Sequence, residues 1–173
     1  MAQIYVSIGT NIERNKHLEM AISELYHHFG ALQVSPVYQS EAVGFEGDDF
    51  YNMVVGFHSD WTIPDLITLF KSLEVKAGRD HSAPKFSART LDIDLLSYGD
   101  MVCQSPIVLP REEILHDAFV LLPLFDVAGD WIHPRQKKSV AELWQAFEQS
   151  SHQLERIADP IDMSKFKQWQ KQR

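Results

Sequence analysis

Two aspartates separated by one residue, Asp92 and Asp94, have the spacing in this chain that most directly suggests chemistry. They alternate with Leu91, Ile93 and Leu95, and alternation is the period of a β-strand, so both carboxylates share one face. Residues two apart on a strand lie about 6–7 Å apart at their Cα atoms, and like charges that close repel unless a cation lies between them. Mg²⁺ takes oxygen ligands and shares them with substrate phosphates, which makes it the natural candidate.

For a lone Asp-x-Asp pair, a solvated strand face is the favoured alternative. Basic residues just before the strand shift the interpretation toward a phosphate site, and they are Arg79, His81, Lys85 and Arg89. Nucleotide phosphates need their charge neutralised by metal and by Arg or Lys. The sequence has no Gly-x-x-x-x-Gly-Lys-Ser/Thr loop and no kinase glycine-rich loop, so a phosphoryl-type transferase would rely on metal and a basic loop instead.

Composition narrows the class of protein. The 173 residues suit one domain with a sizeable core, and a hydrophobic fraction of 45% is ordinary for a globular protein. A net charge of −8 argues against a general nucleic-acid or anionic-membrane binder. Cys103 is the only cysteine, which excludes a disulfide framework within the chain. We find no membrane span, no signal peptide and no evident protein partner, so a cytoplasmic location is expected.

Hydrophobic periodicity predicts strands near residues 3–8, 32–40, 50–58 and 90–98. Helical stripes follow the first and third of these strands; Gly30 ends the first helix and Thr62 caps the start of the second. The order fits an α+β ferredoxin-like sandwich, with a largely antiparallel sheet and helices packed on it. A buried apolar helix around residues 119–127 and a helix with a capping box at Ser139 come next.

We predict one domain over residues 1–149. The polar segment 150–173 carries spaced apolar residues, and it is either an arm docked on the body or a partner, or partly disordered.

Two further side chains have both a functional and a structural interpretation. Asn52 offers a donor and an acceptor side by side, which suits reading the edge of a heterocycle, or else it holds the loop before it. Glu74 borders the apolar stripe of the second helix, where an ion pair with Arg79 is at least as plausible as a ligand contact.

Several ordered segments carry a resemblance to a known family: residues 7–11, 37–40, 50–52, 78–79, 89–94 and 118–124. Arg89-Thr90-Leu91-Asp92-Ile93-Asp94 is the most specific of them. Over roughly residues 3 to 130, most of one domain, the sequence resembles the hydroxymethyl-dihydropterin pyrophosphokinases of the folate pathway.

The resemblance implies a ferredoxin-like fold and transfer of the β,γ-pyrophosphoryl unit of ATP to the hydroxymethyl group of 6-hydroxymethyl-7,8-dihydropterin, with release of AMP. It implies two Mg²⁺ ions held by Asp92 and Asp94, and catalytic roles for Arg79, Arg89 and Asp94. ATP binding is implied for Glu74, Arg79, Lys85, Arg89 and Arg111. Pterin binding is implied for Ser40, Ala42, Val43, Asn52 and Phe119.

The departures from the family pattern lie on the nucleotide side. Lys85-Phe86 stands where members usually have Arg-Trp, so a charge is kept but the bidentate guanidinium and the indole N–H are lost. His81 replaces a basic residue and is only partly charged at neutral pH. Arg111 stands where members commonly have His, and Glu112 adds a negative charge beside it.

Three hypotheses remain open at this point. The chain is an active Mg²⁺-dependent pterin pyrophosphokinase, a paralogue acting on a related pterin alcohol, or a pterin- or nucleotide-binding protein without turnover. The presence of Arg79, Arg89, Asp92 and Asp94 argues against the last.

Overall fold

The longest strands, β1 (Ala2–Thr10) and β4 (Phe50–Ser59), pair antiparallel along their full length and form the centre of the sheet. The computed structural model describes residues 1–41, 47–78, 91–147, 154–158 and 160–162. The remaining strands are β2 (Gln33–Val34), β3 (Val37–Ser40), β5 (Asp92–Tyr98) and β6 (Glu155–Ile157). The helices are α1 (Arg14–Phe29), α2 (Ile63–Lys76), α3 (Glu113–His116), α4 (Ala118–Ala128) and α5 (Val140–Ala146).

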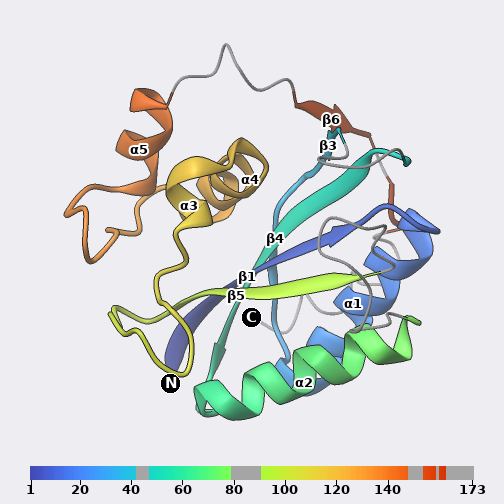
Figure 1. The fold of residues 1–173 in the computed structure, drawn as a ribbon, viewed down its shortest axis with the longest axis horizontal. Helices are drawn as coiled ribbons and strands as arrows, with labels where there is room; N and C mark the ends of the chain where they lie inside the picture. Colours follow the sequence, from blue (N-terminus) through green and yellow to red (C-terminus); the bar gives the residue numbers. More distant parts are fainter. Residues whose placement is uncertain (42–46, 79–90, 148–153, 159, 163–173) are drawn as a thin grey trace.

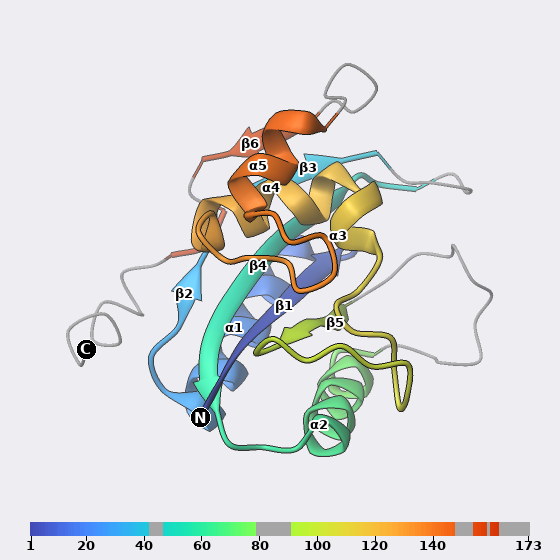
Figure 2. The same ribbon diagram turned by 90° about the vertical axis from the view of Figure 1, so that its left-hand side faces the viewer.

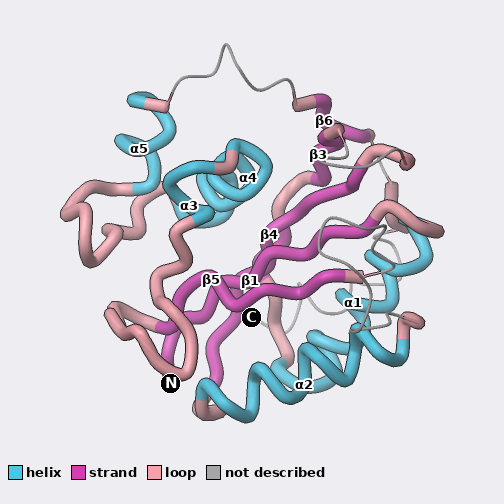
Figure 3. Tube along the Cα trace, in the orientation of Figure 1, coloured by secondary structure: helices cyan, strands magenta, loops and turns pink. Residues whose placement is uncertain are grey.

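The strand order of the sheet is β5-β1-β4-β3-β6, with β2 also paired to β4, and the pairings between these strands are antiparallel. Leaving out β6, this is the βαββαβ order of a ferredoxin-like sandwich, with β2 and β3 together forming its second strand. The predicted fold class is therefore confirmed. Figure 3 shows the strands running between two groups of helices.

The alternation of apolar residues on β1 gives the sheet two buried faces. Ile4, Val6 and Ile8 point into a core shared with α1 and α2, whereas Tyr5 belongs to a second core with α3, α4 and α5. Figures 1 and 2 show these two helical layers on opposite sides of the sheet. The second layer is what turns a plain ferredoxin-like sheet into a three-layer structure.

The predicted helix ends are confirmed. Gly30 adopts φ 76° after α1 and its N–H donates to the carbonyl of Tyr26. The Thr62 side chain accepts from the Asp65 N–H at 3.3 Å at the start of α2. Ser139 and Glu142 form the reciprocal capping box that starts α5.

The second predicted strand is interrupted. The register shifts by one residue between the Val34–Val55 and Tyr38–Asn52 pairs, and Pro36, which lacks an N–H, lies in the break. Ser35 bridges the gap, because its hydroxyl accepts from the Val54 N–H at 2.9 Å. In the predicted strand 32–40, Pro36 indicates an edge position or a bulge, and the register shift at Pro36 confirms the bulge.

The C-terminal segment adds an edge strand to the sheet. β6 pairs antiparallel with β3, joining Val37 to Ile157 and Tyr38 to Arg156. Ile161 lies in the α1–α2 core with 6% of its surface exposed. The described part of this segment is thus docked on the body, while the division of the chain at residue 149 stays a prediction.

None of the helices in the described ranges combines the length and apolar character that crossing a bilayer requires.

We predict that Ile161→Ala lowers the free energy of unfolding by about 2–3 kcal/mol, because it removes a buried side chain from the core. The matched control is Ile132→Ala, since Ile132 is 50% exposed and its truncation is expected to cost about 0.5 kcal/mol or less. Urea unfolding curves measure both. Equal stabilities for the two variants would show that the arm contributes nothing to the core.

Candidate active site

Asp92 and Asp94 lie together on the face of β5 that is turned toward α3 and α4. Ile93 and Leu95, between and after them, point into the opposite core with α1 and α2. In the ladder with β1, Asp92 is opposite Gly9 and Asp94 is opposite Ser7. Both aspartates are half-buried, so their carboxylates border solvent at one end of the sheet. This is the arrangement that the alternating pattern predicted.

The two carboxyl groups crowd each other. Burial, followed by the negative charge of Asp92, raises the pKa of Asp94 to about 7, and a hydrogen bond between the two side chains adds to the rise. Arg111 acts in the opposite direction and favours the charged form of Asp94. A cation placed between the carboxylates would relieve the same repulsion far more completely.

Arg111 reaches the aspartate pair from the segment that follows β5. Its Nη2 lies 3.8 Å from Asp94 Oδ1, and its Nε donates to Glu113 Oε2 at 3.1 Å. The Arg111 backbone N–H donates to the carbonyl of Leu96 at 2.9 Å, which ties the segment to β5. The predicted ATP residue is therefore beside the acidic pair, in contact with two carboxylates. The contact with Glu113 was not predicted.

Glu74 approaches β5 from the other face of the sheet. The residue is 5% exposed, and its Oε2 accepts from the backbone N–H of Ile93 at 3.0 Å. Ile93 lies between the two aspartates, so this bond fixes the strand that carries them. The described contact of Glu74 is structural, and the predicted contact with ATP stays a prediction.

Asn52 lies on the same sheet face, two strands from Asp92. Its Nδ2 donates to Ser40 Oγ at 2.8 Å and to the Tyr38 carbonyl at 3.4 Å. Gly9 lies between Asn52 and Asp92 in the ladder, and a Cβ built on Gly9 would stand 3.5 Å from Asn52 Oδ1. The amide oxygen of Asn52 is thus directed over a position that has no side chain.

One row of paired residues therefore runs Asp92–Gly9–Asn52–Tyr38 across four strands. With about 4.8 Å between neighbouring strands, the backbones of Asp92 and Asn52 are about 10 Å apart. This span has the size of a small heterocycle with a substituent. The acidic pair and the amide therefore lie at opposite ends of a span of this size.

Helix α4 crosses this face and contacts β4 and β3. Phe119 is in its first turn, half-buried against the core that α3, α4 and α5 share with the sheet. An aromatic ring at the rim of this core can stack on a flat ligand.

The remaining predicted site residues lie outside the described residues: Ala42, Val43, Arg79, Lys85 and Arg89. His81 and Phe86, which depart from the family pattern, also lie there. Asn11, just after β1, donates its Nδ2 to the carbonyl of Asp48 at 3.1 Å. The sequence did not predict the contact between Tyr38 and Asp126. The one hint was that Tyr38 lies in the segment 37–40, which carries part of the family resemblance.

The donor set fits Mg²⁺. Asp92 and Asp94 offer hard carboxylate oxygens, which Mg²⁺ prefers, and their mutual repulsion is the electrostatic condition that a cation relieves. Within the described ranges, no group of three or more His, Cys, Asp or Glu side chains forms an all-protein cage. Mg²⁺ bound by two carboxylates needs further oxygens, which substrate phosphates and water provide.

The fold and this site together define a class: an α+β sandwich with a paired-carboxylate, small-molecule site on one face of its sheet. Comparison with known proteins supplies the family. Residues 5–129 match the family described as 7,8-dihydro-6-hydroxymethylpterin-pyrophosphokinase. The chain belongs to this family.

Two relatives named 2-amino-4-hydroxy-6-hydroxymethyldihydropteridine pyrophosphokinase are similar along most of their length. The protein from Synechocystis is 34% identical over 142 residues, which cover 80% of this chain and 72% of the relative. The protein from Aquifex aeolicus is 30% identical over 145 residues, which cover 82% and 90%.

Solved structures agree on the fold. The wild-type Plasmodium falciparum HPPK-DHPS crystal structure with pteroate superposes with a TM-score of 0.67 at 13% identity, over 83% of this chain and 42% of that longer chain. At such low identity the likeness concerns the fold alone. This chain spans less than half the length of that protein.

We predict that Asp94→Asn stabilises the metal-free protein at pH 8. Because the pKa of Asp94 is raised in the folded state to about 7, its favourable contribution is complete below about pH 4 and is lost as the pH rises through 7. Asparagine cannot ionise, so at pH 8 the variant should gain about 1–2 kcal/mol, a figure reduced for the 37% exposure of the Asp94 side chain. Thermal unfolding in EDTA at pH 8 and at pH 4.5 measures the difference. If the variant were less stable than wild type at pH 8, the two carboxylates would not destabilise the folded protein by repelling each other.

We also predict that Glu74→Ala lowers the free energy of unfolding by about 1–3 kcal/mol, because the Ile93 N–H loses its acceptor. Glu74→Gln is the matched control, since its amide oxygen can still accept that bond and most of the stability should remain. Urea unfolding of both variants measures the loss. If the two variants were equally destabilised, the negative charge and not the hydrogen bond would be the important property.

Proposed function

We propose that this chain transfers the β,γ-pyrophosphoryl unit of ATP to the hydroxymethyl group of 6-hydroxymethyl-7,8-dihydropterin. The pterin hydroxyl oxygen bonds to the β-phosphorus, the bond from that phosphorus to the α,β-bridging oxygen breaks, and AMP leaves with that oxygen. The observation that carries the proposal is the row Asp92–Gly9–Asn52 in a chain of this family. In this proposal the aspartates form the phosphate end of the row and Asn52 the heterocycle end, and the spacing of about 10 Å between their backbones suits a pterin with its hydroxymethyl group.

Each end of the row has a distinct role. Asn52 would hydrogen-bond the edge of the pterin, with Ser40 fixing its amide through the 2.8 Å bond, and Phe119 would stack on the ring. Arg111, beside Asp94, would contact the phosphates. Residues carried over from the family pattern complete the proposal: Arg79, Lys85 and Arg89 on ATP, and Ala42 and Val43 on the pterin.

Asp92 and Asp94 would hold two Mg²⁺ ions together with the triphosphate. When bound, such ions neutralise phosphate charge and lower the pKa of the substrate hydroxyl. The hydroxyl proton would leave toward an oxygen of Asp94 or Asp92, the carboxylates at that end of the row. Magnesium dependence, like the cytoplasmic location expected from the sequence, is part of this proposal.

The test is AMP formation from ATP and Mg²⁺ with a panel of pterin alcohols, followed by chromatography. We expect AMP and a pyrophosphorylated pterin in equal amounts, with 6-hydroxymethyl-7,8-dihydropterin the best substrate. Preference for another pterin alcohol would favour the paralogue. Tight pterin binding without AMP from any alcohol would leave only a binding protein.

Within that assay, Asp94→Ala should lower turnover on the order of 10³-fold or more, because the charge stabilisation at the phosphate end is lost. Pterin binding should survive, since Asn52 and Phe119 are unchanged. Asp60→Ala, at an exposed aspartate before α2, is the control and should keep full turnover. Unchanged turnover in Asp94→Ala would refute the metal assignment.

A further inference from the structure

Tyr38 occupies the next position in the row that carries the proposed site. Its backbone pairs with Asn52 of β4 on one side and with Arg156 of β6 on the other. The residue is 7% exposed, and its side chain points to the same face as those of Asn52 and Asp92. Its carbonyl accepts from Asn52 Nδ2 at 3.4 Å, so Tyr38 already contacts the residue assigned to the pterin edge.

The Tyr38 hydroxyl donates to Oδ2 of Asp126 on α4. Burial, followed by this bond and the charge of Asp126, raises the pKa of Tyr38 above its usual range. The bond joins residues that are 88 positions apart and links β3 directly to α4. It connects a strand of the site to the helix that covers it.

The place of Asp126 on α4 gives this bond its importance. Asp126 follows Phe119 by seven positions, which is close to two helical turns, so both residues lie on the same side of the helix. A bond that holds Asp126 against β3 therefore also limits the rotation of α4 about its axis, and with it the direction in which Phe119 projects. The distance between the proposed stacking ring and the Asn52 amide depends on how α4 is seated.

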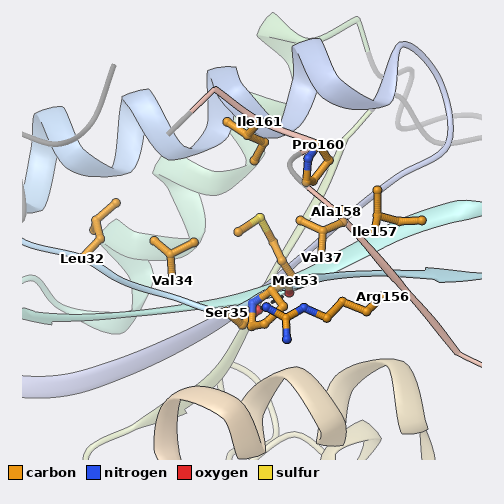
Figure 4. A pocket seen from close by; sticks show the side chains of 11 residues that line it. Leu32, Val34, Ser35, Val37, Met53, Arg156, Ile157, Ala158, Pro160 and Ile161 are labelled. Atoms are coloured by element: carbon orange, nitrogen blue, oxygen red, sulfur yellow. Dashed lines mark hydrogen bonds between the residues drawn. The ribbon is translucent and has the colours of Figure 1, made fainter. Parts of the chain in front are cut away.

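β6 supports Tyr38 from outside the family-matched region, which ends at residue 129. Without β6, Tyr38 would lie on the edge of the sheet; β6 pairs with it, and the positive charge of Arg156 acts on its hydroxyl. Figure 4 shows Val37 and Met53 among the side chains that line a pocket beside the arm. The volume of this pocket is about 570 Å³. Val37 and Met53 belong to the α1–α2 core, so this cavity is on the opposite face from the aspartates and is separate from the proposed site.

We propose that Tyr38 is a positioning residue for the pterin. Its carbonyl orients the Asn52 side chain, and its hydroxyl holds α4 in place through Asp126. As a result, Asn52 can hydrogen-bond the edge of the same pterin ring on which Phe119 stacks. The inference rests on the proposed function, because it assumes that a pterin is the ligand between Asn52 and Phe119.

The experiment is Tyr38→Phe, with pterin binding followed by fluorescence titration of 6-hydroxymethylpterin and with steady-state kinetics for both substrates. We expect the pterin Kd and KM to rise about tenfold, the equivalent of one lost hydrogen bond to a charged group. The KM for ATP and kcat should stay within about twofold of wild type. If Tyr38 had a purely structural role, its substitution would lower stability without raising the KM for the pterin more than the KM for ATP.

Tyr98→Phe is the matched control. Tyr98 donates its hydroxyl to the Trp61 carbonyl at 2.6 Å and pairs with Ile4, at the far end of β5 from the aspartates. Tyr98→Phe loses the same hydroxyl group and one hydrogen bond, but far from the site, and pterin Kd and KM should therefore equal those of wild type. Asp126→Asn retains an acceptor oxygen and should lose less pterin affinity than Asp126→Ala.

Three results would overturn the inference. If Tyr38→Phe binds pterin as tightly as Tyr98→Phe, the bond to Asp126 does not position the ligand. If the KM for ATP rises in parallel with that for the pterin, Tyr38 acts on the fold as a whole. If the wild-type protein neither binds 6-hydroxymethylpterin nor forms AMP, the proposed function fails together with the inference, whereas normal wild-type activity with an unaffected Tyr38→Phe refutes the inference alone.

Discussion

The repulsion between Asp92 and Asp94 is the constraint on which the rest of this site depends. A strand places the two carboxylates on one face whatever their charge, and partial burial deprives them of the water that would screen it. The surrounding structure holds β5 in place against this cost. Glu74 secures the Ile93 N–H from one face of the sheet, and Arg111 offers its guanidinium to Asp94 from the other. A cation bound between the two carboxylates would relieve this repulsion.

The register between β5, β1 and β4 decides which other side chains share a face with the two aspartates. Because Gly9 pairs with both Asp92 and Asn52, the acidic and amide groups face the same side with a gap between them. A shift of one residue in either pairing would turn one group to the opposite face and destroy the site. The pairing of β1 with β4 along its whole length secures the register, and Tyr38 extends the row to the covering helix.

Much of this was predictable because it depends on local sequence. The alternation of apolar residues around Asp92 and Asp94 predicted that both side chains lie on one face of the strand. Helix ends were predictable at Gly30, Thr62 and Ser139, because the hydrogen bonds that end or begin a helix are short-range. What escaped prediction depends on distant partners. The three residues of β6 are too few for a period to appear, and nothing in the sequence connects Tyr38 to Asp126. Pro36 did indicate an edge position or a bulge in the second strand, whereas the size of the register change, one residue, is revealed only by the pairing with β4.

In the proposed reaction, the acidic pair and the Asn52 amide serve one substrate on one face of the sheet. Nuclear relaxation tests it most directly: Mn²⁺ replaces Mg²⁺, a non-hydrolysable ATP analogue is bound, and the proton relaxation rates of bound 6-hydroxymethylpterin are measured. The account predicts the strongest paramagnetic enhancement at the hydroxymethyl protons, with less at the ring proton. Equal or negligible enhancement throughout the pterin would show that it binds away from Asp92 and Asp94, and would contradict the account.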